Sequence, residues 1–145
     1  MGLFARRYYQ GASVGLNDIG AVNYLADIRC LDLYGLANPE VNAAMRKHTY
    51  QFRDIQRLAK ENGTPIAIIY DSWFLGAVPP NWVRVGRWTI PSNVIAGSDT
   101  VSFYATDPSE APHLAGCLRD IAPRLPHEVF QSGPYLASRV EGYHP

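Results

Sequence analysis

The sequence predicts an α/β fold with a mainly parallel sheet of about five strands and flanking helices. Short apolar runs at 13–16, 28–35 and 65–71 alternate with helical patterns in the first half of the chain. The third run, PIAIIYD, is continuously apolar, which is typical of a strand covered on both faces. Residues 83–90 and 100–106 alternate apolar and polar side chains across a short loop, which predicts a C-terminal antiparallel hairpin. Together these elements predict a three-layer, Rossmann-like arrangement.

Helical patterns fill the intervals between the predicted strands. Residues 3–9 predict the end of a helix, and residues 18–27 predict a short helix with Asp18 as its N-cap. Asn38 followed by Pro39 is a strong helix-start signal, because proline is favoured at the first helical position. Each helix therefore falls where a crossover between parallel strands needs one.

The C-terminal part predicts one more helix and then an irregular tail. Residues 107–125 place four apolar side chains at helical spacing. These are Leu114, Cys117, Leu118 and Ile121. The tail at 127–145 is rich in glycine and proline, so we expect residues 1–126 to form a single α/β domain with the tail packed on it or fraying.

The composition argues against a nucleic-acid partner. The chain of 145 residues has 13 basic and 13 acidic residues, and it contains no basic stripe. Charged residues make up 18% of the sequence, against about 25% in an average soluble domain. Either part of the surface faces a partner, a membrane or another domain, or Tyr, Asn, Ser and Pro replace charge on a solvated surface. No apolar run reaches the length of a membrane-spanning helix.

Cysteine and histidine residues do not predict a metal site or a cofactor. Cys30 and Cys117 lack metal-ligand spacing and are expected to be buried thiols, although a single bridge stays open in an oxidising compartment. None of the histidines is paired at metal spacing, so surface or helix-end positions are expected for all four. They are His48, His113, His127 and His144.

Three acids fall where predicted strands end: Asp18, Asp32 and Asp71. Ligands of open α/β sheets bind outside the carboxyl ends of the strands, so adjacent parallel strands would bring these carboxylates to one edge. Such an edge suits a divalent cation or the hydroxyl groups of a sugar. The alternative is that Asp18 caps a helix while Asp32 and Asp71 accept from backbone amides in turns.

Two aromatic residues directly follow the third strand, in the sequence Asp71-Ser72-Trp73-Phe74. Aromatic rings beside a carboxylate are suited to stacking on a sugar while its hydroxyl groups are bound. The alternative is that Trp73 and Phe74 cover the core or contact another domain. The hypothetical ligand-binding set, with no catalytic residue and no metal ligand assigned, is Asn17, Asp18, Asp32, Asp71, Trp73 and Phe74.

Residues 16–41, LNDIGAVNYLADIRCLDLYGLANPEV, carry a resemblance to a known group. The segment resembles the C-terminal soluble domain of bacterial polytopic membrane glycosyltransferases and their uncharacterised relatives. In that group a strand ends in N-D-I-G-A, and the next strand reads roughly L-D-x-x-G-L before a helix that opens with N/S-P-E. The matching residues are Asn17, Asp18, Ile19, Gly20, Ala21, Leu31, Asp32, Gly35, Leu36, Pro39 and Glu40.

The resemblance implies a function on the extracytoplasmic face of the bacterial cytoplasmic membrane. The full-length enzymes transfer sugars from polyprenyl-linked donors, and their catalytic acid lies in a membrane portion that this sequence lacks. The chain by itself is therefore not expected to catalyse transfer. Its implied role is an accessory or binding domain that contacts an acceptor glycan or a polyprenyl-linked sugar, or packs on the membrane domain of the same protein.

Two other functions stay open. One is a small standalone metal-dependent hydrolase that uses the strand-end aspartates. The other is a purely structural interaction domain. Without the resemblance, the expected location is the cytoplasm as a soluble protein.

Overall fold

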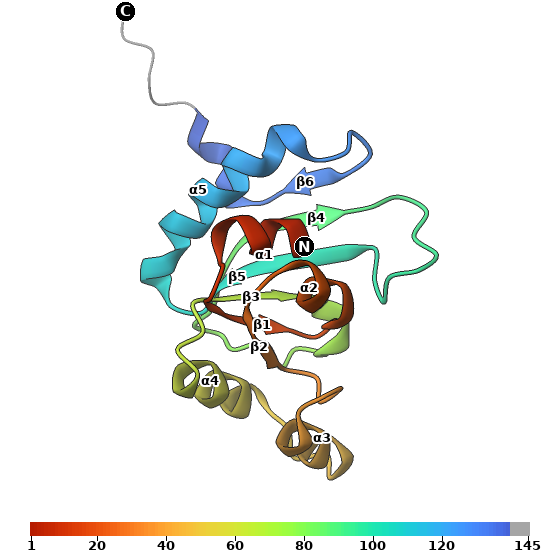
Figure 1. Ribbon diagram of the computed structural model, residues 1–145. Helices are drawn as coiled ribbons and strands as arrows, with labels where there is room; N and C mark the ends of the chain where they lie inside the picture. The colour runs from red at the N-terminus through yellow and green to blue at the C-terminus, as the bar shows by residue number, and fades with distance from the viewer. Residues whose placement is uncertain (140–145) are drawn as a thin grey trace, which may run out of the picture.

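The computed structural model describes residues 1–139 and shows a mixed α/β fold around one open sheet (Figure 1). The six strands lie in the order β2-β1-β3-β5-β4-β6. Their bounds are β1 Ser13–Leu16, β2 Arg29–Asp32, β3 Ile66–Ile69, β4 Val83–Thr89, β5 Thr100–Ala105 and β6 Phe130–Ser132.

The sheet is parallel in one half and antiparallel in the other. β1 pairs in parallel with β2 and β3, whereas the β3–β5, β5–β4 and β4–β6 pairs are antiparallel. The prediction of an α/β fold is confirmed, as is the antiparallel hairpin β4–β5. The sheet is mixed rather than mainly parallel, because the hairpin inserts β5 next to β3 and a further strand joins β4.

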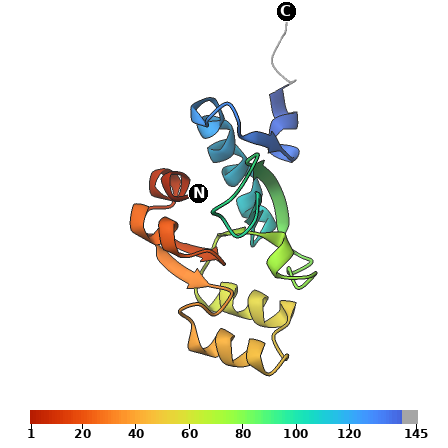
Figure 2. The same ribbon diagram turned by 90° about the vertical axis from the view of Figure 1, so that its right-hand side faces the viewer.

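Helices cover both faces of the sheet. The α-helices are α1 Gly2–Tyr8, α2 Gly20–Leu25, α3 Pro39–Arg46, α4 Phe52–Glu61 and α5 Ala111–Ile121. Short 3₁₀ helices are η1 Asp71–Trp73, η2 Pro108–Glu110, η3 Ala122–Arg124 and η4 Pro134–Arg139. Figures 1 and 2 show α3 and α4 together at one end of the molecule, near β2, with β6 at the other end.

Alternate side chains of β3 feed two separate hydrophobic clusters. Ile66 and Ile68 belong to the first hydrophobic cluster, which is formed with α1, α2 and α5. Ala67 and Ile69 belong to the second hydrophobic cluster, which is formed with α3 and α4. All four residues are buried, which confirms the expectation of a strand covered on both faces. This double cover explains why the run is apolar at every position rather than at every second one.

The two helix-start predictions have different outcomes. The Asn38 side chain accepts hydrogen bonds from the backbone N–H groups of Glu40 and Val41, with Pro39 in the first turn, so the predicted N-cap of α3 is confirmed. Asp18 does not cap α2, because the N-cap is Ile19 and no side chain bonds the helix start. The hydroxyl of Tyr70 donates to the Asp18 carboxylate instead.

The segment predicted as an irregular tail contributes to the sheet within its described part. β6 pairs with β4 in the register Trp88–Gln131, and the aromatic ring of Tyr135 is buried against Gly86. The predicted apolar face of α5 is confirmed, since its four predicted residues are all buried. Residues 140–145, which include His144, lie outside the described residues.

Both cysteine thiols are free. Cys117 is buried in the first hydrophobic cluster and Cys30 is half-buried on β2. Burial raises the pKa of both thiols above the ordinary value, which keeps them protonated. They act as small hydrophobic side chains, as expected.

Candidate functional site

The three strand-end aspartates lie at one edge of the sheet. β2, β1 and β3 are adjacent and parallel, and Leu16 is in register with Asp32 and with Ile68. Asp18 and Asp71 each follow their strand by two residues, so all three acids lie at the carboxyl edge. Within residues 1–139, however, no three histidine, cysteine or acidic side chains come close enough to hold a metal ion. Different neighbours bind each carboxylate, and they do not form a common cation site.

Asp32 organises the turn between β2 and α3. Its Oδ1 accepts from the N–H groups of Tyr34 and Gly35, both at 2.9 Å, and its Oδ2 accepts from those of Ala37 at 2.5 Å and Asn38 at 3.0 Å. Only 5% of the residue is exposed. Four backbone donors fill the acceptor positions of this carboxylate, so it serves the turn as the alternative interpretation expected.

Gly35 completes the same turn. Its φ is +80°, a conformation that L side chains rarely adopt. A Cβ at this position would lie 2.6 Å from the backbone nitrogen of Asn42, in the first turns of α3. The glycine is therefore required both by the backbone conformation and by the close approach of the helix.

Asp71 anchors η1 to the antiparallel half of the sheet. The hydroxyl groups of Ser102 and Tyr104 donate to its two carboxylate oxygens at 2.8 and 2.9 Å. Arg87 and Arg84 approach Oδ2 to 3.5 and 3.7 Å. Both arginines of β4 therefore lie beside an acid of this chain. Asp71 therefore accepts two hydroxyl hydrogen bonds and lies beside two arginines, all from within the chain.

Asp18 retains unused hydrogen-bonding capacity. This half-buried carboxylate receives one hydrogen bond within the described residues, from the Tyr70 hydroxyl at 3.1 Å. Burial, followed by the negative charge of Asp18, raises the pKa of Tyr70 to about 12, so the phenol stays a proton donor. The adjacent Asn17 is 1% exposed, and its Oδ1 accepts from the Tyr70 backbone N–H at 3.0 Å.

The amide nitrogen of Asn17 is buried without a hydrogen-bond partner among the described residues. An unpaired donor beside a carboxylate with free acceptor positions is an unusual combination at the end of a strand. This pair of side chains lies between the ends of β1 and β3. The chain connections on the two sides of this point cross opposite faces of the sheet, and ligands of α/β folds bind at such a switch point. Of the hypothetical ligand-binding set, Asn17 and Asp18 are the members that this geometry favours.

The two aromatic residues after β3 have separate roles. Phe74 is buried in the second hydrophobic cluster, so it covers the core. Trp73 is half-buried. The centroid of its ring lies 4.6 Å from the ring centroid of Tyr34 and 5.7 Å from that of Tyr70. Its indole N–H donates to the carbonyl of Gly97 at 3.2 Å. Trp73 thereby joins the loop after β3 to the loop between β4 and β5.

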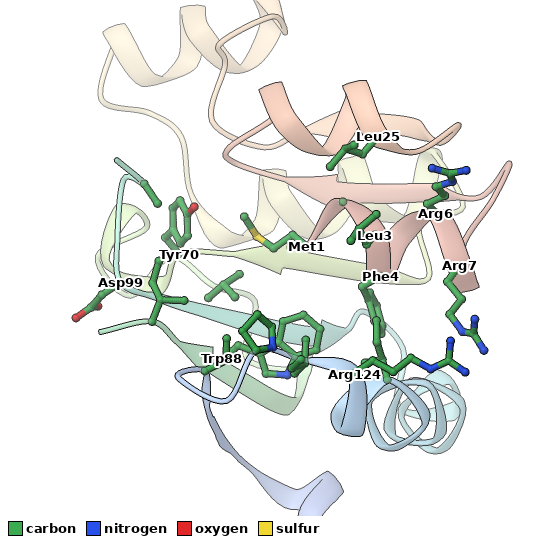
Figure 3. A pocket seen from close by; sticks show the side chains of 18 of the residues that line it. Met1, Leu3, Phe4, Arg6, Arg7, Leu25, Tyr70, Trp88, Asp99 and Arg124 are labelled. Carbon is green, nitrogen blue, oxygen red and sulfur yellow. The ribbon is translucent and has the colours of Figure 1, made fainter. Parts of the chain in front are cut away.

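Tyr70 also borders a groove of about 780 Å³ that runs beside α1 (Figure 3). No sequence pattern predicts this groove, because its walls come from α1, from β4 and β5 with their loop, and from residues 121–129. Figure 3 shows three arginines, Arg6, Arg7 and Arg124, at one end, and Tyr70 and Asp99 at the other. The adjacent Arg6-Arg7 pair was the one local signal, and nothing in the sequence connects it to Arg124. The apolar lining includes Met1, Leu3, Phe4, Leu25, Trp88, Ile90, Val101, Ile121, Leu125 and Val129.

Comparison with known proteins identifies a family and no function. No curated protein matches this chain, and no solved structure matches it. The family described as "Domain of unknown function (DUF8728)" matches residues 1–104, from α1 into β5. The match covers Asn17, Asp18 and Tyr70, whereas Arg124 and Tyr135 lie beyond it. Because it spans more than half of the 145 residues, the chain belongs to the DUF8728 family.

Proposed function

We propose that this chain is an accessory domain of a membrane glycosyltransferase-like protein and that it packs on the membrane domain through loops at the carboxyl edge of the sheet. The observation that carries the proposal is the exposure of large apolar side chains on two loops, the loop after β3 and the loop between β4 and β5. Leu75 is 93% exposed, Val94 is 91% exposed and Ile95 is 95% exposed. Exposed apolar residues that gather on one side of a domain are typical of a contact with a protein or a membrane.

The two loops leave the sheet at the same edge. Ile69 at the end of β3 is in register with Ser102 near the start of β5, and Thr89 at the end of β4 is in register with Thr100. The hydrogen bond from Trp73 to Gly97 holds the loops together. Figure 1 shows the N-terminus on this side as well. The charge-poor composition and the resemblance of residues 16–41 support the same proposal.

Among the helices within residues 1–139, none combines the length and the apolar character that crossing a membrane requires.

We further propose that the parallel half of the sheet is the three-layer, Rossmann-like part of the fold. The strand order β2-β1-β3 is that of the first half of a doubly wound sheet, and hydrophobic clusters lie against helices on both of its faces. This interpretation supports a ligand site at the carboxyl ends of β1 and β3.

A photo-crosslinker at Ile95, introduced into the protein expressed from its complete reading frame, tests the packing. We expect cross-links to segments of a polytopic membrane protein, or to the membrane part of the same chain, identified by mass spectrometry. The matched control is Phe130, which is 68% exposed on β6 at the far end of the sheet. Equal cross-linking from both positions, or none to a membrane protein from Ile95, would contradict the proposal.

A second candidate function is binding of an acceptor glycan, or of the sugar of a polyprenyl-linked donor, beside Asp18. The free acceptor positions of Asp18 and the unpaired amide of Asn17 suit the hydroxyl groups of a sugar, and the rings of Tyr70 and Trp73 lie nearby. Asp32 and Asp71 are left out of this version because hydrogen bonds and ion pairs within the chain already engage them.

Titration with neutral mono- and disaccharides, followed by amide NMR, tests the glycan site. We expect chemical-shift changes at Asn17, Asp18 and the Trp73 indole N–H, and their loss in Asp18→Asn. The control Asp27→Asn removes the same charge at an exposed acid whose side chain makes no hydrogen bond within residues 1–139. Shifts that survive Asp18→Asn, or their absence at high millimolar sugar, would remove this candidate.

The two remaining candidate functions are a metal-dependent hydrolase and a purely structural interaction domain. The metal-dependent hydrolase built on three aspartates has less support, because Asp32 and Asp71 accept hydrogen bonds from within the chain and no three metal-ligand side chains lie together within residues 1–139. A purely structural interaction domain remains compatible with the packing proposal, since it needs the exposed loops and no ligand.

A further inference from the structure

We infer that the groove beside α1 binds a single-chain anionic amphiphile, with its hydrocarbon chain along the apolar walls and its phosphate or carboxylate head at the three arginines. This inference does not depend on the packing or glycan proposals, although the groove adjoins both surfaces through Tyr70 and the β4–β5 loop. It rests on the shape of the groove, the packing of its walls and the placement of charge at its ends.

The groove is a preformed apolar surface. Phe4 packs edge-on against Trp88, with 5.8 Å between ring centroids, and Trp88 lies 4.4 Å from the ring of Phe103. Phe4, Trp88, Val101 and Ile121 are all at least nine-tenths buried, so the surrounding core holds them in place. The groove volume of about 780 Å³ falls within the range of about 300–1,000 Å³ that is usual for small-molecule sites.

Positive charge is concentrated at one end of this groove. Arg6 and Arg7 lie in the last turn of α1, and Arg124 ends η3 on the opposite wall (Figure 3). Asp120 forms an ion pair with Arg7 at 3.3 Å and is also close enough to Arg124 to feel its charge. Arg6 makes no ion pair within the described part of the chain. Arg7 and Arg124 therefore share one carboxylate, and Arg6 adds a third positive charge to the same end of the groove, so an anionic head would supply the missing negative charge.

The opposite end of the groove sets the orientation of the ligand. Asp99 is exposed there beside Tyr70, and its negative charge would repel an anionic head. Between the two ends the lining is almost entirely hydrocarbon and aromatic, so a polar ligand would leave its hydrogen-bonding groups unpaired. A ligand that is anionic at one end and apolar along its length fits both observations.

Binding of decyl phosphate below its micellar concentration tests the inference. Isothermal calorimetry and amide NMR on the full chain are expected to show binding, with shifts at Phe4, Val101 and the Trp88 indole N–H. Decanoate is expected to shift the same resonances. Inorganic phosphate alone should produce none of them, which separates a site for an amphiphile from a site for a free anion.

Charge and chain specificity are tested separately. Decyltrimethylammonium, with the same chain and the opposite charge, should bind about tenfold more weakly than decyl phosphate. The double variant Arg6→Gln/Arg124→Gln should weaken decyl phosphate about tenfold and leave the neutral decyl maltoside unchanged. The matched control is Arg46→Gln/Arg53→Gln on α3 and α4, which removes the same charge away from the groove and should bind as the wild type does.

A second variant tests the apolar wall without disturbing the core. Leu3 is 63% exposed and lines the groove, whereas Leu36 is 58% exposed and does not line it. Leu3→Glu should abolish decyl phosphate binding, and Leu36→Glu should not affect it. The inference is overturned if the cationic and anionic probes bind equally, if the arginine variants bind as the wild type does, or if no probe binds at millimolar concentration.

Discussion

Replacement of Asp32 by alanine is expected to lower the free energy of unfolding by about 3 kcal/mol, because buried backbone donors lose a charged acceptor. Four N–H groups, from Tyr34 to Asn38, share this carboxylate, and the residue is only 5% exposed. Water can reach some of these donors in the variant, so the loss is smaller than four separate bonds would suggest. Urea denaturation followed by circular dichroism measures the difference.

Two further substitutions show whether the cost arises from the turn. Asp32→Asn keeps one acceptor oxygen but points an NH₂ group at the N–H groups of Ala37 and Asn38, so we expect about 2 kcal/mol of destabilisation. Asp27→Ala, at an exposed acid, should stay within about 0.5 kcal/mol of the wild type. If Asp32→Ala proves as mild as Asp27→Ala, the carboxylate does not hold the turn, and its role as a ligand residue reopens.

Replacement of Tyr135 by alanine is expected to cost about 3 kcal/mol, because it leaves a cavity against the sheet. The ring is 1% exposed in the first hydrophobic cluster, its hydroxyl donates to Gln131 at 2.8 Å, and Arg119 donates to its carbonyl at 3.3 Å. Tyr135→Phe should cost about 1 kcal/mol, since only the hydroxyl bond is lost. Tyr24→Ala, at a residue that is 89% exposed, should be nearly neutral.

The contact between Tyr135 and Gly86 makes a double-mutant test possible. A Cβ at Gly86 would lie 2.7 Å from the Tyr135 ring and 3.0 Å from the Leu118 side chain, so Gly86→Ala alone should cost about 2 kcal/mol. In the Tyr135→Ala background the new methyl group enters the vacated space, and most of that cost should disappear. Additive effects of the two substitutions would mean that the ring does not pack on β4 as described.

The hydrogen bonds that Asp32 accepts in its turn also explain the motif by which the sequence resembles the membrane glycosyltransferase domains. In L-D-x-x-G-L followed by N-P-E, Asp32 binds the turn, Gly35 adopts a positive φ, Asn38 caps α3 and Pro39 occupies its first turn. Each of these residues serves local backbone structure, and none is left free for a ligand. The motif therefore predicts local structure well and says little about ligand binding or catalysis. The N-D-I-G-A part differs, because Asn17 and Asp18 both contact Tyr70, the residue that directly follows β3.

Some of the site could be anticipated from strand order and some could not. A shared edge for the three aspartates follows from three adjacent parallel strands, and the sheet contains them. Which carboxylates are already occupied depends on partners distant in the sequence: Ser102 and Tyr104 for Asp71, and Tyr70 for Asp18. No sequence pattern identifies these partners, because a serine or tyrosine with an ordinary hydroxyl could equally well be exposed to solvent.

What the sequence determined by itself was local: the positions of strands β1 to β5, the capped start of α3 and the apolar face of α5. Periodicity, capping and backbone conformation act within a few residues and therefore leave a readable pattern. Only the tertiary structure decided the insertion of β5 beside β3, the addition of β6, the placement of Tyr135 over Gly86 and the joining of Arg6, Arg7 and Arg124 around one groove. These contacts join segments of the chain that are far apart, and they form because they bury apolar surface that many different partners could have covered equally well.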